Sequence, residues 1–238
     1  MRINHQPAFL LHARPWSETS LLVDMFTREY GRFRLLAKGA RRQKTGQRAI
    51  LQSFQPLSIS WSGKRSLMTL TGTEALQTYP RLKHRSLASA YYMSELLFKF
   101  LHANDSHEVL FEAYAQAIEQ LAGNQESETV LRGFECSLLS EVGYGLQLEF
   151  DASSLLPIKN DAHYFYYPEK GPVEIDGQHD ENGLAVSGRT LKSLAARQFV
   201  DQGSLKESKH LLRHLLARQI AGRSLNTREV YTQMLKLK

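Results

Sequence analysis

The hydrophobic pattern of the sequence changes near residue 80, and this change limits the folds that the chain can adopt. Before it, apolar residues fall in short, often alternating runs separated by turn residues, a pattern typical of β-strands. Such runs begin at Pro7, Ser20, Arg32, Pro56 and Ser66. The commonest five-stranded barrel that binds nucleic acid is the OB barrel. We therefore expect a five-stranded OB-type β-barrel over residues 1–80.

After residue 80 the apolar residues recur every three or four positions, which predicts helices with one buried face. Helices are expected over residues 84–103, 106–123, 127–145 and 187–199, from Ser204 with a capping box to Glu207, and from Asn226. Between them, residues 147–187 mix clustered aromatics with turn residues, which indicates an irregular, partly hairpin-like insertion. The predicted fold class is α+β, with the barrel followed by a mainly α-helical bundle over residues 81–238.

Positive charge is concentrated at the two ends of the chain. Residues 1–80 hold 12 basic and 4 acidic residues, 81–188 hold 7 and 17, and 189–238 hold 11 and 3. The stretch from Arg32 to Arg48 contains seven Lys or Arg and no Asp or Glu. A solvated loop that only improves solubility is the plain alternative. Because the charge extends onto a predicted strand, we instead expect a nucleic-acid partner.

Strand alternation predicts which face of the strand carries this charge. Arg32, Arg34 and Lys38 would share one face of a strand, while Phe33 and Leu35 point to the other, inward face. The residues predicted to bind the nucleic acid are Arg14, Arg32, Arg34, Lys38, Arg41, Arg42, Lys44, Arg48, Lys64 and Arg65.

Single strands are the expected target, because OB barrels combine a cationic groove with aromatic side chains on which bases stack. Trp16 and Tyr30 are the candidates for stacking, whereas Trp61 ends an apolar alternation and is expected in the core. Contact with about five phosphates would cost about a hundredfold in affinity between 50 and 200 mM salt.

Two groups of motifs resemble the RecO family of bacterial DNA repair proteins. "FLLHARPWSETSLLVDMFTREYGRFRLLAKGARR" and "LQSFQPL" resemble the N-terminal domain of that family, and "YYMSELL" and "LRGFECSLLSEVGYG" resemble its helical domain. The resemblance covers nearly the whole chain. It implies binding of single- and double-stranded DNA, annealing of complementary strands, and a mediator role in which RecR and the protein help RecA replace single-strand-binding protein. None of these steps makes or breaks a covalent bond, so the resemblance implies a protein that is not an enzyme.

The sequence departs from some family members, which carry a four-cysteine zinc site in the second domain. Here Cys136 is the only cysteine, so we expect neither zinc nor another cofactor, and the insertion would be held by its aromatics alone. The single cysteine also excludes an internal disulfide and favours a reducing, cytoplasmic compartment. Binding to DNA, which the resemblance implies, would make the protein nucleoid-associated. No segment is apolar enough to predict a membrane span.

A second site is expected on the helix from Ser204, where a basic rim lies beside apolar residues. The family resemblance supplies a ligand, the acidic tail of single-strand-binding protein, which ends in a phenylalanine carboxylate. The residues assigned to this site are Arg132, Lys209, Arg213, Arg223, Leu212 and Leu216. The alternative is a cationic face that pairs with the acidic middle segment of the chain.

Other functional readings are weaker. His102, Asp105 and His107 could form a metal cluster, but their segment also reads as a polar loop. Cys136 has no adjacent base and is expected to be inert. Two other classes remain as alternatives, an RNA-binding OB accessory protein and a metal-dependent nuclease.

Overall fold

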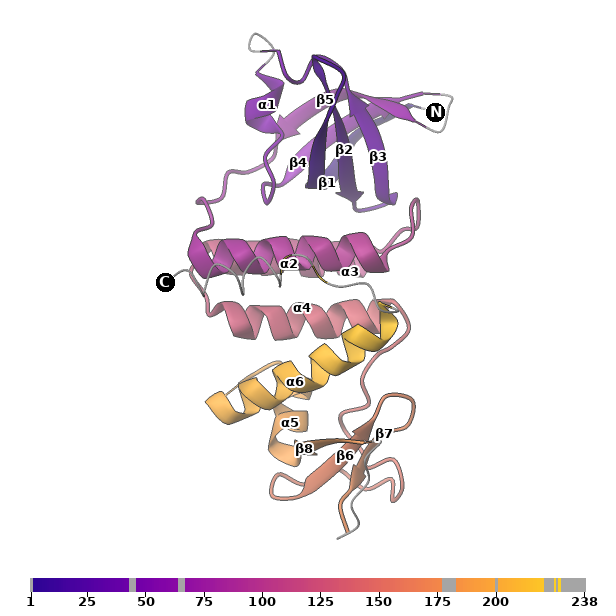
Figure 1. Cartoon of the computed structure of the whole chain (residues 1–238), viewed down its shortest axis with the longest axis vertical. Coiled ribbons are helices and arrows are strands. Elements are labelled where there is room, and N and C mark those ends of the chain that lie inside the picture. Colours follow the sequence, from indigo (N-terminus) through magenta and orange to yellow (C-terminus); the bar gives the residue numbers. More distant parts are fainter. Residues whose placement is uncertain are drawn as a thin grey trace. The chain divides into compact units, whose positions relative to one another are not determined.

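The computed structural model describes residues 2–42, 46–63, 67–176, 183–199 and 201–220, together with Leu225 and Thr227. The chain divides into two compact units, one formed by residues 1–124 and 226–238 and the other by residues 125–225. Figure 1 shows the strands and helices of each unit. The expected helix from Asn226 lies outside the described residues, apart from Thr227.

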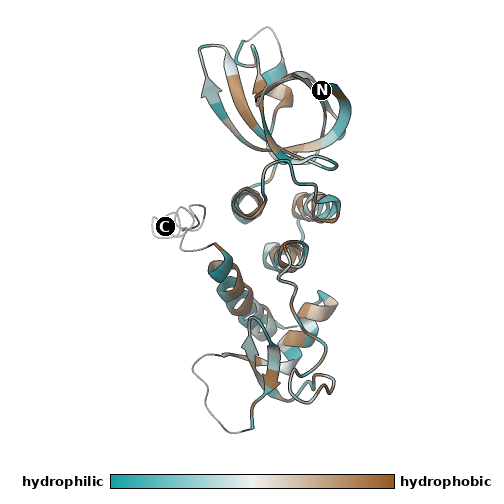
Figure 2. Cartoon of the chain, turned by 90° about the vertical axis from the view of Figure 1, so that its right-hand side faces the viewer, coloured by the Kyte–Doolittle hydropathy of each residue, from teal (hydrophilic) through white to brown (hydrophobic). Residues whose placement is uncertain are grey.

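The first unit begins with a closed five-stranded barrel in the order β1-β2-β3-β5-β4. Its elements are β1 (Arg2–Trp16), β2 (Ser20–Thr27), β3 (Gly31–Ala37), the short helix α1 (Gln47–Ile50), β4 (Leu57–Ser62) and β5 (Met68–Ala75). Only β3 and β5 pair in parallel. Figure 2 looks into the ring that the strands form. The predicted OB-type barrel is thus confirmed, although β1 starts earlier than its sequence pattern indicated.

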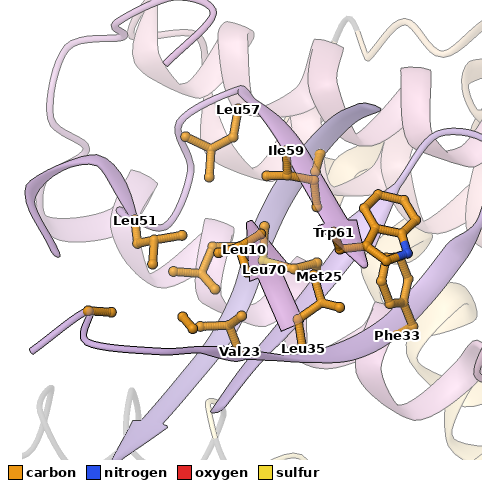
Figure 3. Packing of buried hydrophobic residues seen from close by; sticks show 13 residues of the cluster. Leu10, Val23, Met25, Phe33, Leu35, Leu51, Leu57, Ile59, Trp61 and Leu70 are labelled. Carbon is orange, nitrogen blue, oxygen red and sulfur yellow. The ribbon is translucent and has the colours of Figure 1, made fainter. Parts of the chain in front are cut away.

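The barrel core follows from strand alternation. On β3, Phe33, Leu35 and Ala37 are buried, whereas Arg34 between them is exposed. Trp61 is only 1% exposed and packs against Phe33, as Figure 3 shows. The prediction that Trp61 belongs to the core is therefore confirmed.

The first unit also contains two helices, α2 (His84–Phe100) and α3 (Glu108–Ala122). Aromatic rings join α3 to the outer face of the barrel: Phe9 and Phe26 of the strands lie 5.1 to 6.3 Å from the rings of Phe111 and Tyr114. The Tyr114 hydroxyl lies 2.8 Å from Ser94 Oγ, and burial raises its pKa, so the phenol stays protonated. This packing places the unit boundary after α3, whereas the periodicity of the sequence changes near residue 80.

The second unit contains three helices and a small antiparallel sheet in the order β7-β6-β8. Its elements are α4 (Ser127–Glu141), β6 (His163–Tyr167), β7 (Gly171–Glu174), β8 (Leu184–Ser187), α5 (Gly188–Ala196) and α6 (Gln202–Gln219). The predicted capping box is wrong, because Asp201 caps α6 by accepting from Ser204 N. Glu207 instead accepts from the hydroxyls of Ser187 and Thr190.

A buried carboxylate holds the irregular part of the insertion. Asp151 is 3% exposed, and its oxygens accept hydrogen bonds from the backbone N–H groups of Ser153, Ser154 and Glu174 and from the Ser154 hydroxyl. Burial alone would raise the pKa of Asp151, but these bonds outweigh it and lower the pKa. The expectation that aromatics alone hold this segment is therefore wrong.

None of the helices in the described part of the chain is long and apolar enough to cross a membrane.

Candidate nucleic-acid interface

The outer face of β1, β2 and β3 carries side chains in cross-strand rows, because the pairing register aligns the three strands. Starting from the end near the helices, the rows are Phe9, Phe26 and Arg32; then His12, Asp24 and Arg34; then Arg14, Leu22 and Leu36. Trp16, paired with Ser20, ends the face. The cations predicted on β3 therefore have different surroundings, which depend on the row.

Arg32 is attached to the helices of its own unit. Its Nε and Nη2 donate to the carbonyl of Leu101 at 3.3 and 3.1 Å, and its guanidinium lies 4.5 Å from the centre of the Phe98 ring. Partial burial is the largest cause of its lowered pKa, although a guanidinium remains protonated in proteins. The assignment of Arg32 to DNA binding is corrected, because its donors act inside the fold.

The neighbouring turn reinforces this attachment. Gly31 has φ +65°, and a Cβ there would overlap the backbone of Asp105, so only glycine fits this close approach. Asn104 N donates to the carbonyl of Arg32 at 2.8 Å, and Arg28 forms ion pairs with Glu108 and Glu112. This end of the barrel face is therefore an intramolecular contact.

Arg34 is neutralised by a carboxylate on the neighbouring strand. Its Nε and Nη2 bind Asp24 Oδ1 and Oδ2 at 2.9 and 3.2 Å, a two-bond pair that is strong and directional. Asp24 is 1% exposed, and His12 Nδ1 lies 3.9 Å from its Oδ2. Although the stretch from Arg32 to Arg48 contains no Asp or Glu of its own, Arg34 is thus compensated by an acid on the neighbouring strand.

A signal for this pair was present in the sequence. A carboxylate in an apolar strand needs a partner, and the short β2–β3 turn, with Thr27 opposite Gly31, sets Asp24 opposite Arg34. The pair becomes visible only when the two strands are aligned in the register of the hairpin, because Asp24 and Arg34 are ten residues apart in the sequence.

Beyond Arg34, the barrel face ends in a group of exposed cations that we call the hairpin-end surface, formed by Arg14, Trp16, Lys38, Arg41 and Arg42. The loop after β3 is fixed on the β1–β2 hairpin, because Arg41 N donates to Thr19 O at 2.9 Å and Arg41 Nη1 donates to Ser17 O at 3.0 Å. Gly39, at φ +71°, turns the chain there, and Arg42 N donates to its carbonyl.

Three cations of the hairpin-end surface, Arg14, Lys38 and Arg41, differ from Arg34 in their electrostatic surroundings. Within the described residues, Arg14, Lys38 and Arg41 form no ion pair with a carboxylate. Trp16 is 47% exposed at the end of β1. Cations beside an exposed aromatic ring match the combination that binds single-stranded nucleic acid.

Of the remaining residues predicted to contact DNA, the structure describes Arg48 and Tyr30. Arg48 is exposed on α1, while Lys44, Lys64 and Arg65 lie outside the described residues. Tyr30 is partly buried and meets the Trp61 ring edge-on, with the centroids 5.3 Å apart. Tyr30 is therefore part of the core packing, and Trp16 is the better stacking candidate.

The predicted tail-binding site on α6 is not assembled as expected. Arg132 is 4% exposed; its Nη2 donates to Glu135 Oε1 at 2.8 Å, and its Nε lies 2.7 Å from Oε2 without the alignment of a hydrogen bond. Leu212 and Leu216 are buried in their own unit, so they offer no surface for a ligand ring. These three assignments are corrected.

The other three residues assigned to that site are Lys209, Arg213 and Arg223. Lys209 Nζ binds Glu128 at 2.8 Å, as the alternative of pairing with the acidic middle segment proposed. Arg213 is exposed, and Arg223 lies outside the described residues.

The structure also describes the surroundings of Cys136 and of the possible metal cluster at His102, Asp105 and His107. Cys136 lies on α4, and burial together with Glu135 raises the pKa of its thiol to about 12, which opposes a nucleophilic role. His107 Nε2 lies 3.5 Å from Asp105. Among the described residues, no three His, Cys, Asp or Glu side chains are grouped so that they could hold a metal ion.

The sequence matches two family models and is similar to curated relatives over nearly its whole length. One family model, "Recombination protein O N terminal", matches residues 1–79, and a second, "Recombination protein O C terminal", matches residues 81–229. The chain is 43% identical over 237 residues to the DNA repair protein RecO of Nitrosococcus oceani, covering 100% of this chain and 96% of the relative. It is 43% identical to the protein of the same name from Aromatoleum aromaticum, covering 99% and 98% of the two chains. It is 42% identical to that of Dechloromonas aromatica, with the same coverage.

Proposed function

The chain belongs to the RecO family of bacterial DNA repair proteins, and from this we propose that its hairpin-end surface binds the sugar-phosphate backbone of single- and double-stranded DNA. Bound strands are annealed to their complements, and RecA is helped to replace single-strand-binding protein on gapped DNA. We propose that the protein does this as a binding factor, without covalent chemistry.

One observation carries this proposal: Arg14, Lys38 and Arg41 lie together at the end of the barrel face, exposed and without a described carboxylate partner. Phosphate contacts of this kind position a strand without reading its sequence. They also leave the base edges accessible, because the cations contact the backbone. A second strand can therefore pair with the bound one, which is what annealing requires.

Trp16 adds an interaction that only an unpaired base can use. A base–aromatic stack contributes about 1 to 3 kcal/mol per base and tolerates any sequence. We propose that Trp16 favours single strands over duplex, while the neighbouring cations serve both.

The proposal also includes partner proteins. RecR and the acidic tail of single-strand-binding protein are the proposed partners, with a functional link to RecA. For the tail, exposed Arg213 on α6 is the remaining candidate anchor, together with Lys209 if Glu128 releases it. Arg213→Glu is expected to weaken binding of a tail peptide in titration calorimetry, and unchanged affinity would remove α6 from the proposal.

The experiment that tests the function is strand annealing on complementary oligonucleotides coated with single-strand-binding protein. The wild-type protein is expected to accelerate annealing, and Lys38→Glu/Arg41→Glu is expected to reduce the rate to that without protein. Lys170→Glu/Lys192→Glu makes the same charge change at exposed positions of the second unit and serves as the matched control. Equal annealing by both double variants would contradict the proposal, and preference for RNA over DNA of matched length would favour an RNA-binding role.

A further inference from the structure

The first unit contains a pocket of about 560 Å³ that the interface described above does not use. It is lined by α1 and the segment after it, and by the chain from the end of β5 into α2; the lining includes Ile50, Phe54, Arg81, Leu87 and Tyr91. Pockets of roughly 300 to 1,000 Å³ are typical of sites that hold a small ligand.

The walls of this pocket are held together by specific contacts. The Gln55 side chain pairs with the backbone of Tyr79, since Tyr79 N donates to Oε1 at 2.8 Å and Nε2 donates to Tyr79 O at 3.2 Å. The Phe54 ring meets the Tyr91 ring edge-on at 4.9 Å between centroids. Phe54 also has φ +65°, a strained conformation for a residue other than glycine that persists only where the surroundings hold it. The pocket is therefore preformed.

The lining offers a cation, aromatic rings and apolar side chains, which together suit an anionic ligand with a flat ring. Arg81 is exposed, and the lining residues include no Asp or Glu. Tyr91 is 48% exposed, and Ile50 and Leu87 add apolar surface. Burial is the largest cause of the raised pKa of Tyr79, and Glu119 adds to it, so this hydroxyl stays a hydrogen-bond donor. A nucleotide combines the negative charge, the ring and the acceptors that such a lining can bind.

The pocket is also continuous in sequence with the cationic loop. Exposed Arg42 is the last residue of the hairpin-end surface along the chain, and exposed Arg48 lies on α1, directly before the lining residues Ala49 and Ile50. Gln52, another lining residue, donates to the carbonyl of Arg48 at 2.8 Å. Cations are thus placed along the chain between the two sites.

We propose that this pocket takes one nucleotide of a single DNA strand whose backbone lies on the hairpin-end surface. This inference rests on the proposed function and extends it to a second contact. A base that is paired and stacked in a duplex cannot enter, whereas a base of a flexible single strand pays little to leave its stack. The pocket therefore selects single strands.

The test measures binding of fluorescently labelled oligo(dT) and of a matched duplex to the full chain by anisotropy. Arg81→Ala and Tyr91→Ala are each expected to weaken single-strand binding about tenfold, as for loss of a charged or stacking contact, and to change duplex binding less than twofold. Lys83→Ala is the matched control, because it removes an exposed cation two residues from Arg81 that is not part of the lining. Arg81→Ala removes no described packing contact, so it remains informative if Tyr91→Ala impairs folding.

Photocrosslinking locates the contact directly. With 5-iododeoxyuridine in the oligonucleotide, crosslinks to Tyr91 or Tyr79 are expected in addition to those at Trp16. Crosslinks at Trp16 alone, with unchanged single-strand affinity of Arg81→Ala, would overturn the pocket proposal and leave the hairpin-end surface intact. If Lys38→Glu/Arg41→Glu binds DNA normally while the pocket variants are impaired, the proposed interface fails and the pocket does not.

Discussion

The two ends of strand β3 carry cations of the same kind in opposite situations. At the end near the helices, Arg32 donates to Leu101 and lies over Phe98, so its charge is used inside the fold. At the other end, Lys38 and Arg41 are exposed beside the β1–β2 hairpin, without a described carboxylate partner. Arg34, between them, is paired with Asp24. A dense run of positive charge therefore divides into structural and available cations within a few residues.

The number of cations in a stretch of sequence therefore does not predict how many of them are available to bind a ligand. Because a guanidinium that already donates two hydrogen bonds within the protein would have to give them up to bind phosphate, each structural cation contributes little to DNA affinity. We therefore expect mutations at the helix end of β3 to change stability, and mutations at its hairpin end to change DNA affinity.

The largest effect is expected for DNA affinity at the hairpin end. Lys38→Glu/Arg41→Glu should weaken oligo(dT) binding about a hundredfold at low salt, because two attractive contacts with phosphate become repulsive. The melting temperature should stay close to that of the wild type, because neither side chain is buried and the described side-chain hydrogen bond that is lost, from Arg41 Nη1 to Ser17 O, is exposed. Anisotropy titration and thermal unfolding measure the two quantities, and a collapse of stability in this variant would remove the distinction between the two ends.

The next effect is expected for stability at the helix end. Arg32→Ala should lower the free energy of unfolding by about 2 kcal/mol, through loss of charge-assisted hydrogen bonds and the contact with Phe98. Oligo(dT) affinity should change less than twofold. Urea denaturation compares this variant with Arg14→Ala, an exposed arginine on the same face whose loss should cost less than about 0.5 kcal/mol. Equal destabilisation by the two would show that Arg32 is not a structural cation.

A smaller effect on affinity is expected at the exposed ring. Trp16→Ala should weaken single-strand binding about tenfold, consistent with one lost base stack, and leave duplex binding within twofold. Trp16→Phe should restore most of the affinity, since a ring is retained. Equal losses for single strands and duplex would argue against stacking.

The smallest effect is expected at the centre of the strand. Asp24→Asn should release Arg34 and raise oligo(dT) affinity about two- to threefold, at a cost in stability, because a buried charge pair loses one member. Asp161→Asn changes the net charge equally at an exposed position of the second unit and is the control. Unchanged affinity in Asp24→Asn would mean that Arg34 does not reach the DNA even when it is free.

Local patterns in the sequence predicted the barrel and its inward side chains, because strand alternation depends only on neighbouring residues. Phe33, Leu35 and Trp61 are buried as expected. Arg32 could not be assigned in this way, since its acceptor on Leu101 is 69 residues away. Asp24 could have been paired with Arg34 from the hairpin register, which combines two local patterns.

The second candidate site was poorly predicted for a related reason. A helical pattern shows that α6 has an apolar stripe, but it does not show that other elements cover the stripe. Leu212 and Leu216 are buried in their own unit, and Arg132 is buried beside Glu135. The helical pattern and the family resemblance together suggested a ligand for side chains that are already buried or paired within the fold.

Phosphate is proposed to bind the hairpin-end cations and not Arg32, and the salt dependence of oligo(dT) affinity distinguishes the two possibilities. About five phosphate contacts predict a slope of log affinity against log salt of about −3.5 for the wild type, reduced by about 1.4 in Lys38→Ala/Arg41→Ala and unchanged in Arg32→Ala. A flat response in the wild type, or a loss of slope in Arg32→Ala as large as in the double variant, would contradict the account.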